Sequence, residues 1–335
     1  MKKIYITDYI KNPDIEKKIL SKYAEVICLN EKDEEKITDE ISDADGILVW
    51  HTKISEITLK KLNKQTAIIR YGVGIDNIDL KSVKKYNHIF ANTPDYGVDE
   101  VADTASAMIL NLIRKIQIYN NRTKSHFGSW QGEVINLNKD NPIKRTSEHS
   151  LGIIGLGRIG SALALRMKAH NIQIGFYDPY IESGYEKVLG IKRYKTLKDL
   201  KSKSSVISIN AVLTPETNKM VNKEFINSLI DNTILVNTAR GAIIEDLDVI
   251  LEGLKNNKLS AVGLDVLPEE PPKQSNRLIE IWKNSKDILS DRIIINPHAG
   301  YFSSQSIKEM RVKASENMLS FLVGNKVNNI VRFKE

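Results

Sequence analysis

The feature that most constrains this chain is a glycine-rich turn near the middle of its 335 residues. The run GLGRIG at 155–160 follows an apolar stretch, Leu151–Ile154, and opens a segment with helical periodicity. Between a strand and a helix, the G-x-G-x-x-G pattern is typical of dinucleotide-binding domains, although the pattern alone is weak. Gly155 permits the tight turn, Gly157 lets the backbone approach a pyrophosphate, and Gly160 allows close packing of helix on strand.

Residues next to the turn complete a predicted dinucleotide site. Arg158 lies in the turn and Ile159 begins the predicted helix, whose unpaired N–H groups and partial positive charge would face the phosphates. Asp178 follows the next apolar run and lies eighteen residues beyond Gly160. A carboxylate at this position binds the ribose hydroxyls and repels the 2′-phosphate of NADP, so NAD is the predicted cofactor. The alternative is a structural glycine turn that binds no ligand.

Short apolar runs alternate with helical patterns on both sides of the turn, which predicts α/β architecture with parallel sheets covered on both faces. A final helix, Ser303–Phe321, is expected to return to the first domain. The predicted strands are Lys3–Thr7, Glu25–Leu29, Gly46–Trp50, Ala67–Arg70, Leu151–Leu156, Ile172–Tyr177, Val206–Asn210, Ile234–Asn237, Ala261–Val266 and Ile293–Asn296. The other predicted helices are Asp14–Lys22, Glu34–Ser42, Thr58–Leu62, Val98–Ile118 and Ile159–Ala169, and 128–145 is expected to be a loop.

Composition narrows the function classes. The net charge of +7 arises from 49 basic and 42 acidic residues that are interleaved, so we interpret it as a solvated lysine-rich surface and expect no nucleic-acid partner. No apolar run reaches the roughly 18–20 residues of a membrane span, so no membrane partner is expected. The single cysteine, Cys28, excludes an internal disulfide and, with an N-terminus that reads as a strand, predicts a cytoplasmic protein. The six histidines form no metal-ligand pattern with it.

Four motifs in a fixed order give the chain a resemblance to a known family. Their order and spread over most of the sequence resemble the D-isomer-specific 2-hydroxyacid dehydrogenase family. In finer detail, 50–52, 70–79 and 177–180 are most similar to its C-terminal-binding-protein corepressors, and 298–302 is similar to D-lactate dehydrogenases. The motifs are RYGVGIDNID at 70–79, the glycine turn, VNTARG at 236–241, and Asp265 through Glu270-Pro271 to NPHA at 296–299.

The resemblance implies a domain organisation and an activity. It implies a central Rossmann NAD-binding domain, 98–301, and a flavodoxin-like substrate domain built from 1–97 and 302–335. Both would be doubly wound parallel-sheet domains. The implied reaction is NAD-dependent hydride transfer between a D-2-hydroxy acid and a 2-oxo acid, in a homodimer. The predicted helix Val98–Ile118, with small residues at Ala102, Ala105 and Ala107, is expected to pack against its copy.

Three residues are predicted to carry the chemistry. Arg240 and His298 follow strands at the carboxyl edge of the predicted sheet, where ligands of open α/β sheets bind. A guanidinium grips a carboxylate and polarises the carbonyl, and imidazole transfers a proton near neutral pH. Glu270 would orient His298 and stabilise its protonated form, and the family gives the matching residues these roles. Singly, His298 also fits a structural histidine, Arg240 a surface cation, and Glu269 competes with Glu270.

Further residues are assigned to the substrate. Backbone N–H groups of Val73 and Gly74 are expected to meet the substrate carboxylate. Arg70 resembles a substrate-contacting arginine of the corepressor branch, although a salt bridge at the domain interface is an equal alternative. Tyr301 replaces the tryptophan of that branch, which leaves the preferred substrate side chain open. His51 is expected to take no direct part in catalysis.

The remaining predictions concern the cofactor. By family position, Thr238, Ala239 and Asp265 line the nicotinamide, and Thr217 faces the adenosine side or the pyrophosphate. Asn210-Ala211 replaces a histidine-led segment of relatives, which is expected to alter packing more than chemistry.

Three other functions stay open. A corepressor-like NAD-sensing scaffold keeps every catalytic residue; a peptide-binding cleft or a long disordered tail would favour it, and no such tail is expected after the last helix. Formate or phosphite oxidation fits the fold, but Glu270-Pro271 argues against formate enzymes. Oxidation of 3-phosphoglycerate is also possible, with Lys53 as a candidate phosphate contact.

Overall fold

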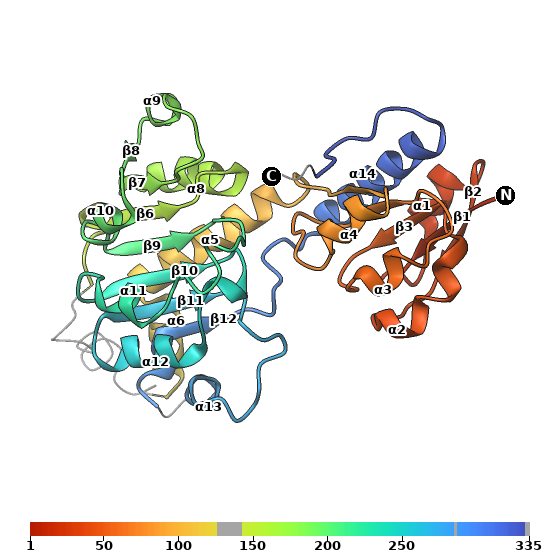
Figure 1. Ribbon diagram of the computed structural model, residues 1–335. Helices are drawn as coiled ribbons and strands as arrows, with labels where there is room; N and C mark the ends of the chain where they lie inside the picture. The colour runs from red at the N-terminus through yellow and green to blue at the C-terminus, as the bar shows by residue number, and fades with distance from the viewer. Residues whose placement is uncertain (126–142, 285–286, 332–335) are drawn as a thin grey trace. The chain divides into compact units, whose positions relative to one another are not determined.

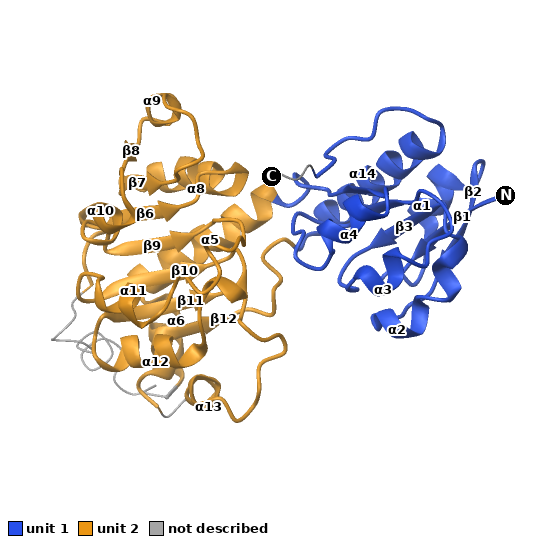
Figure 2. Cartoon of the chain, in the orientation of Figure 1, with its two compact units in different colours: residues 1–97, 302–335 blue, residues 98–301 orange. Residues whose placement is uncertain are grey.

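The computed structural model describes residues 1–125, 143–284 and 287–331. The chain divides into two compact units. Unit 1 contains 1–97 and 302–335, and unit 2 contains 98–301 (Figure 2).

Unit 1 is built on a five-stranded parallel sheet in the order β2-β1-β3-β4-β5. This is the flavodoxin-like order, in which the direction of winding changes between the first and third strands. Buried runs such as GILV in β3 explain why the strands form here, because helices cover the sheet on both faces. The strands are β1 (Lys2–Ile6), β2 (Ala24–Cys28), β3 (Gly46–Val49), β4 (Ala67–Arg70) and β5 (Ile89–Ala91) (Figure 1).

The C-terminal helix α14 (Ser304–Leu322) belongs to unit 1, where it packs against α1 (Asp14–Leu20) and β4. An ion pair joins α14 to α1, because Arg311 Nη2 lies 2.6 Å from Oε2 of the fully buried Glu16. Glu16 also accepts a hydrogen bond of 2.9 Å from the hydroxyl of Tyr71, the residue after β4. The shorter helices of this unit are α2 (Glu34–Ile37), α3 (Glu56–Leu59) and α4 (Leu80–Lys85).

Unit 2 contains a seven-stranded parallel sheet in the order β12-β11-β10-β9-β6-β7-β8. Numbered within the unit this is 3-2-1-4-5-6 with one added edge strand, which is the Rossmann order. Its winding direction changes between β6 and β9. The strands are β6 (Ser150–Ile154), β7 (Gln173–Tyr177), β8 (Lys192–Arg193), β9 (Val206–Ile209), β10 (Thr233–Asn237), β11 (Leu259–Leu264) and β12 (Ile293–Ile295).

Two hydrophobic cores hold the helices of unit 2 to opposite faces of its sheet. One core includes residues of α5 and α8, and the other includes residues of α11, α12 and α13. The prediction of two parallel-sheet α/β domains is therefore confirmed. The helices are α5 (Val98–Arg114), α6 (Ile116–Ser125), α8 (Arg158–Lys168), α9 (Tyr185–Leu189), α10 (Leu197–Lys201), α11 (Lys223–Asn227), α12 (Leu247–Lys255) and α13 (Arg277–Lys283).

Several predicted details are wrong. The single helix Val98–Ile118 is interrupted at Lys115, whose backbone is left-handed at φ 55°, so α5 and α6 are separate. Of the three small residues predicted to contact a second subunit, Ala102 and Ala105 are instead buried in the core shared with α8, and only Ala107 is exposed. The short strands β5 and β8 were not predicted, and Glu34–Ser42 divides into α2 and a 3-10 turn. Most of the predicted loop 128–145 lies outside the described residues.

No helix within the described ranges has the length and apolar character needed to cross a membrane.

Candidate functional site

The glycine turn of unit 2 lies at the end of β6, beside the point where the winding of the sheet reverses. Gly155 is left-handed at φ 89°, and its N–H donates to Tyr177 O at 3.0 Å. A Cβ on Gly160 would lie 2.2 Å from Gly155 O, so no side chain fits between turn and helix. A Cβ on Gly157 would meet no described atom within 4 Å. Two glycines thus serve packing, while the third keeps the helix N-terminus open to a ligand.

Asp178 is fixed beside this turn. Its carboxylate accepts hydrogen bonds of 2.9 Å from the backbone N–H of Leu156 and of Tyr180. The hydroxyl of Tyr180 in turn hydrogen-bonds Glu216, in the loop after β9. A half-exposed carboxylate held next to the phosphate-binding turn matches the ribose contact expected for NAD.

Two buried polar atoms near the same sheet edge have no partner among the described residues. They are Oγ1 of Thr238, just after β10, and Oδ1 of Asn210, just after β9. Buried polar atoms are nearly always hydrogen-bonded, so unpaired ones indicate a missing ligand or solvent. Together with the open face of Gly157 and the carboxylate of Asp178, they fit a dinucleotide such as NAD. In the described ranges, no cluster of three or more His, Cys, Asp or Glu side chains could hold a metal ion.

His298 and Glu270 form a close pair at the carboxyl end of the same sheet. His298 Nδ1 lies 2.7 Å from Glu270 Oε2, and both side chains are partly exposed, at 36% and 37%. The other Glu270 oxygen accepts a hydrogen bond of 2.8 Å from the backbone N–H of Leu267, which fixes the carboxylate. Because Nδ1 is engaged by Glu270, Nε2 is the ring nitrogen available for proton transfer.

The electrostatics of this pair favour an ionised carboxylate. Burial alone would raise the pKa of Glu270, but hydrogen bonding and charge from His298, the Leu267 N–H and the charge of Arg240 outweigh it, so the pKa is lowered. Arg240 itself follows β10, and its position is held by a hydrogen bond of 3.0 Å from the side chain of Asn237 to Arg240 O. Its Nη1 also donates to Ala239 O at 2.8 Å. A fixed negative charge next to an imidazole stabilises the protonated ring.

Asp265 holds the segment that carries His298. This residue directly follows β11, is 3% exposed, and accepts from the N–H groups of Ala299 and Gly300 at 3.0–3.1 Å. Its main-chain oxygen accepts from the N–H of His298 at 2.8 Å. Burial raises the pKa of Asp265, and the Gly300 N–H opposes that shift only in part. The structure therefore gives Asp265 an anchoring role that sequence reasoning missed.

Two other predicted residues are engaged locally. The ring of Tyr301 lies 6.3 Å from that of His298, edge to face at 81°. The hydroxyl of Thr217 donates to Val212 O at 2.6 Å and caps its own turn. Its role toward the cofactor stays a prediction, as does that of Ala239.

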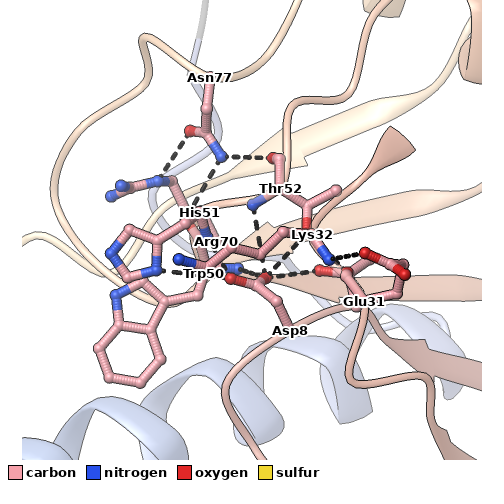
Figure 3. A network of polar contacts seen from close by, with 9 residues as sticks. Asp8, Glu31, Lys32, Trp50, His51, Thr52, Arg70 and Asn77 are labelled. Carbon is pink, nitrogen blue, oxygen red and sulfur yellow. Dashed lines mark hydrogen bonds and ion pairs between the residues drawn. The ribbon is translucent and has the colours of Figure 1, made fainter. Parts of the chain in front are cut away.

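The predicted substrate residues of unit 1 lie at the end of β4, in the case of Arg70, and in the loop that follows it. Arg70 Nε donates to Asn77 Oδ1 at 2.9 Å, and the Asn77 amide nitrogen donates to Trp50 O and Thr52 O at 3.3 and 2.8 Å (Figure 3). Val73 is 40% exposed, and its carbonyl accepts from Asn92 at 2.7 Å. Like Val73, Gly74 lies in the loop that follows Gly72.

A buried carboxylate at the end of β1 was overlooked in the sequence. Asp8 is 2% exposed and accepts hydrogen bonds from the N–H groups of Trp50, His51 and Thr52 and from the hydroxyls of Thr52 and Thr7. Burial opposes ionisation, but these donors and His51 hold the pKa of Asp8 well below its usual range. The one available signal was an acid directly after a buried strand. Nothing in the sequence indicated that its donors would include Trp50, His51 and Thr52, which lie more than forty residues away.

Comparison with known proteins identifies the family. Residues 106–300 match the family described as "D-isomer specific 2-hydroxyacid dehydrogenase, NAD binding domain". The chain belongs to this family. Its four motifs and the resemblance drawn from them are thereby confirmed at the level of the family.

Named relatives span a wider group of enzymes. The chain is 31% identical over 332 residues to the D-3-phosphoglycerate dehydrogenase of Methanocaldococcus jannaschii, and 30% identical over 325 residues to that of Bacillus subtilis. The alignments cover 99% and 97% of this chain but only 59% and 58% of the relatives. A solved structure of D-lactate dehydrogenase from Aquifex aeolicus with NAD and lactic acid is 26% identical and superposes with a TM-score of 0.82, covering 99% of this chain and 100% of that one.

Proposed function

We propose that this family member is an NAD-dependent oxidoreductase that interconverts a D-2-hydroxy acid and a 2-oxo acid. The observation that carries the proposal is the His298–Glu270 pair at 2.7 Å, within the electrostatic influence of Arg240. The pair shares its sheet edge with a glycine turn and carboxylate that fit a dinucleotide. An acid–base pair, a carboxylate-binding cation and a dinucleotide site are together what this reaction requires.

Each side chain has a defined task in the proposal. The bound dinucleotide would supply a hydride to C2 of the substrate as NADH, or accept one from C2 as NAD. Nε2 of His298 gives a proton to the carbonyl oxygen during reduction and removes it during oxidation. Glu270 keeps the ring oriented and stabilises its protonated form. The guanidinium of Arg240 grips the substrate carboxylate and stabilises negative charge on the carbonyl oxygen.

The other site residues are proposed to bind. Thr238, Ala239 and Asp265 lie at strand ends suited to the nicotinamide side, although Asp265 acts chiefly through the loop that it anchors. Arg70 and the N–H groups of Val73 and Gly74 are proposed substrate contacts. Tyr301 is proposed to contact the substrate side chain, because its ring lies edge-on to His298.

The substrate itself is proposed only as a class. A 2-oxo acid fits Arg240 and His298 whatever its side chain. The phosphoglycerate dehydrogenases among its relatives favour 3-phosphoglycerate as an alternative, but this chain spans only about three-fifths of their length. We also propose a homodimer, the commonest closed assembly, which sedimentation equilibrium would test.

A screen of NADH oxidation tests the activity. The full chain is assayed with pyruvate, hydroxypyruvate, glyoxylate and branched or aromatic 2-oxo acids, beside NAD reduction with 3-phosphoglycerate. We expect turnover of at least one acid and a loss of about 10³-fold in His298→Gln, the size of general acid–base catalysis. His170→Gln, at an exposed histidine, is the matched control. Wild-type turnover no faster than His298→Gln, with NAD still bound, would instead favour a corepressor-like scaffold.

A further inference from the structure

The turns after β10 and β11 carry Arg240 and Glu270, and their backbones are in direct contact. β10 and β11 are neighbours in the sheet of unit 2, and both turns begin at its carboxyl edge (Figure 1). A Cβ on Gly241 would lie 1.8 Å from the main-chain oxygen of Leu267 and 2.1 Å from its carbonyl carbon. No side chain fits in that space, so a glycine is needed for the two turns to meet.

Leu267 joins this contact to the acid–base pair. Its carbonyl faces Gly241, and its N–H donates to Oε1 of Glu270 at 2.8 Å. The other Glu270 oxygen lies 2.7 Å from Nδ1 of His298. Leu267 is itself 6% exposed and belongs to a hydrophobic core of unit 2, so it is fixed in place. One buried residue therefore determines where the Glu270 carboxylate lies relative to Gly241.

The backbone of Arg240 is held on the other side of the same contact. Asn237, the last residue of β10, is fully buried. Its Oδ1 accepts from the N–H of Ala239 at 3.0 Å, and its Nδ2 donates to Arg240 O at 3.0 Å. The main-chain oxygen of Asn237 accepts from the N–H of Asp265 at 3.0 Å, which ties the ends of β10 and β11 together. A side-chain amide that is engaged at both ends restricts the peptide of Arg240 to one orientation.

The contact at Gly241 differs from that of another buried glycine in the same unit. A Cβ on Gly253, in α12, would meet only side-chain atoms of Ile226 and Leu259, at 2.9–3.1 Å. Side chains can move aside, whereas the Leu267 peptide is part of the backbone. A methyl group on Gly241 must therefore shift one turn relative to the other, and a methyl group on Gly253 need not.

We propose that Gly241 is a positioning residue that sets the separation of the Arg240 guanidinium from the Glu270–His298 pair. Asn237 assists it by holding the Arg240 peptide. In the proposed reaction the cation and the imidazole act on one substrate, and a misplacement of about 1 Å between such groups can cost roughly 10²-fold in rate. The inference rests on the proposed function and deepens it by naming the contact that spaces its functional groups.

Gly241→Ala tests the contact in the full chain, with whichever of pyruvate, hydroxypyruvate and glyoxylate is turned over fastest. The added methyl group separates the turns, so we expect kcat/KM to fall at least tenfold. His298, Arg240 and Asp265 are charged groups that act on Glu270, and only Arg240 lies on the turn that contains Gly241. With that cation farther away the pKa of Glu270 rises, so the loss of kcat on acidification should begin at a higher pH than in the wild type.

Two further variants separate positioning from folding. Gly253→Ala should lower the midpoint of urea unfolding but leave KM and the pH profile of kcat unchanged. Asn237→Ala keeps the Gly241 contact and releases the Arg240 peptide, so it should raise KM about fivefold with a smaller effect on kcat. Calorimetric titration with NADH should give the same affinity, within threefold, for Gly241→Ala and the wild type, because the glycine turn is untouched.

The outcomes distinguish this inference from the proposed function. A folded Gly241→Ala variant with wild-type kcat/KM and pH profile would overturn the inference, as would an equal shift of the profile in Gly253→Ala. If Gly241→Ala does not fold, Asn237→Ala decides, and an unchanged KM in that variant overturns the inference. Absence of turnover with every acid in the wild-type chain would overturn the proposed function instead.

Discussion

At the carboxyl edge of each sheet, a buried acid holds a loop, but the two units use this acid differently. In each unit a buried acid directly beyond a strand holds a neighbouring loop that carries a histidine: Asp8 holds the loop of His51, and Asp265 holds the loop of His298. In unit 1 that acid also faces the imidazole. In unit 2 a second acid, Glu270, hydrogen-bonds the imidazole ring of His298.

This difference has electrostatic consequences. Among the described residues, the Asp8 carboxylate accepts from five donors and its pKa is lowered, whereas the Asp265 carboxylate accepts from two backbone N–H groups and burial raises its pKa. Because Asp265 anchors the loop, one oxygen of Glu270 is left for His298, while the other accepts from the Leu267 N–H. The arrangement in unit 2 suits a histidine that changes its charge during turnover, and the arrangement in unit 1 suits one that is held in place.

Glu270→Gln tests whether the second acid of unit 2 acts through the His298 ring, and it has a large expected effect. The amide keeps an oxygen for the Leu267 N–H but loses the charge that stabilises protonated His298. We expect kcat for oxo-acid reduction to fall by roughly 10²-fold. The pKa of Glu270 is lowered, so the wild type loses this charge only as the pH falls through that lowered value, and the rates of wild type and variant should converge there. The pH profile of kcat is the measurement. A profile that keeps its shape would show that the carboxylate does not act through the ring.

A second, smaller effect separates the two anchors. Asp8→Asn should cost about 2 kcal/mol of unfolding free energy at neutral pH, because an amide cannot accept from all the donors. Asp265→Asn should lower the unfolding free energy by less. The raised pKa of Asp265 means that folding stabilises its ionised carboxylate less than it stabilises that of Asp8. Urea unfolding and hydrogen exchange at the amides of Trp50, His51 and Thr52 would measure this. Equal costs would contradict the distinction drawn between the anchors.

Asp8 and Asp265 should contribute to folding stability with opposite dependences on pH. The pKa of Asp8 is lowered by folding, so its stabilisation is present above its unfolded value near 3.8 and is lost as the pH falls below that. The pKa of Asp265 is raised, so its contribution is favourable at low pH and is lost as the pH rises through the folded value. Asp8→Asn should therefore flatten the acid limb of the stability curve, while Asp265→Asn should not.

The turns after the first strands of the two sheets offer a third, still smaller test. Unit 1 places Asp8 there, and unit 2 places the open Gly157. Gly157→Ala should fold normally, because its Cβ meets no described atom within 4 Å, but it should weaken NAD binding about tenfold by intruding on the phosphate position. Calorimetric titration measures this. Gly160→Ala is the matched contrast, since its Cβ would meet Gly155 O at 2.2 Å and should destabilise the turn itself.

The sequence predicted the parts of this molecule that depend on local pattern. The turn at 155–160, the alternation of strands and helices, and the strand-end residues Arg240 and His298 were all readable, because motif and periodicity are short-range signals. The break at Lys115 was not, since a left-handed lysine carries no mark in a helical pattern. The Asp8 network was also missed, because most of its donors lie in the loop after β3 and only the order of the sheet brings that loop beside Asp8.

The most direct test of the account compares the two histidines in one assay. The enzyme is preloaded with NADH, and a single turnover of the preferred 2-oxo acid is followed at saturating concentration in the wild type, His298→Gln and His51→Gln. The account predicts that His298→Gln slows the step about 10³-fold, the scale of general acid–base catalysis, and that His51→Gln slows it no more than threefold. A His51 variant as slow as the His298 variant, or a His298 variant near the wild-type rate, would contradict it.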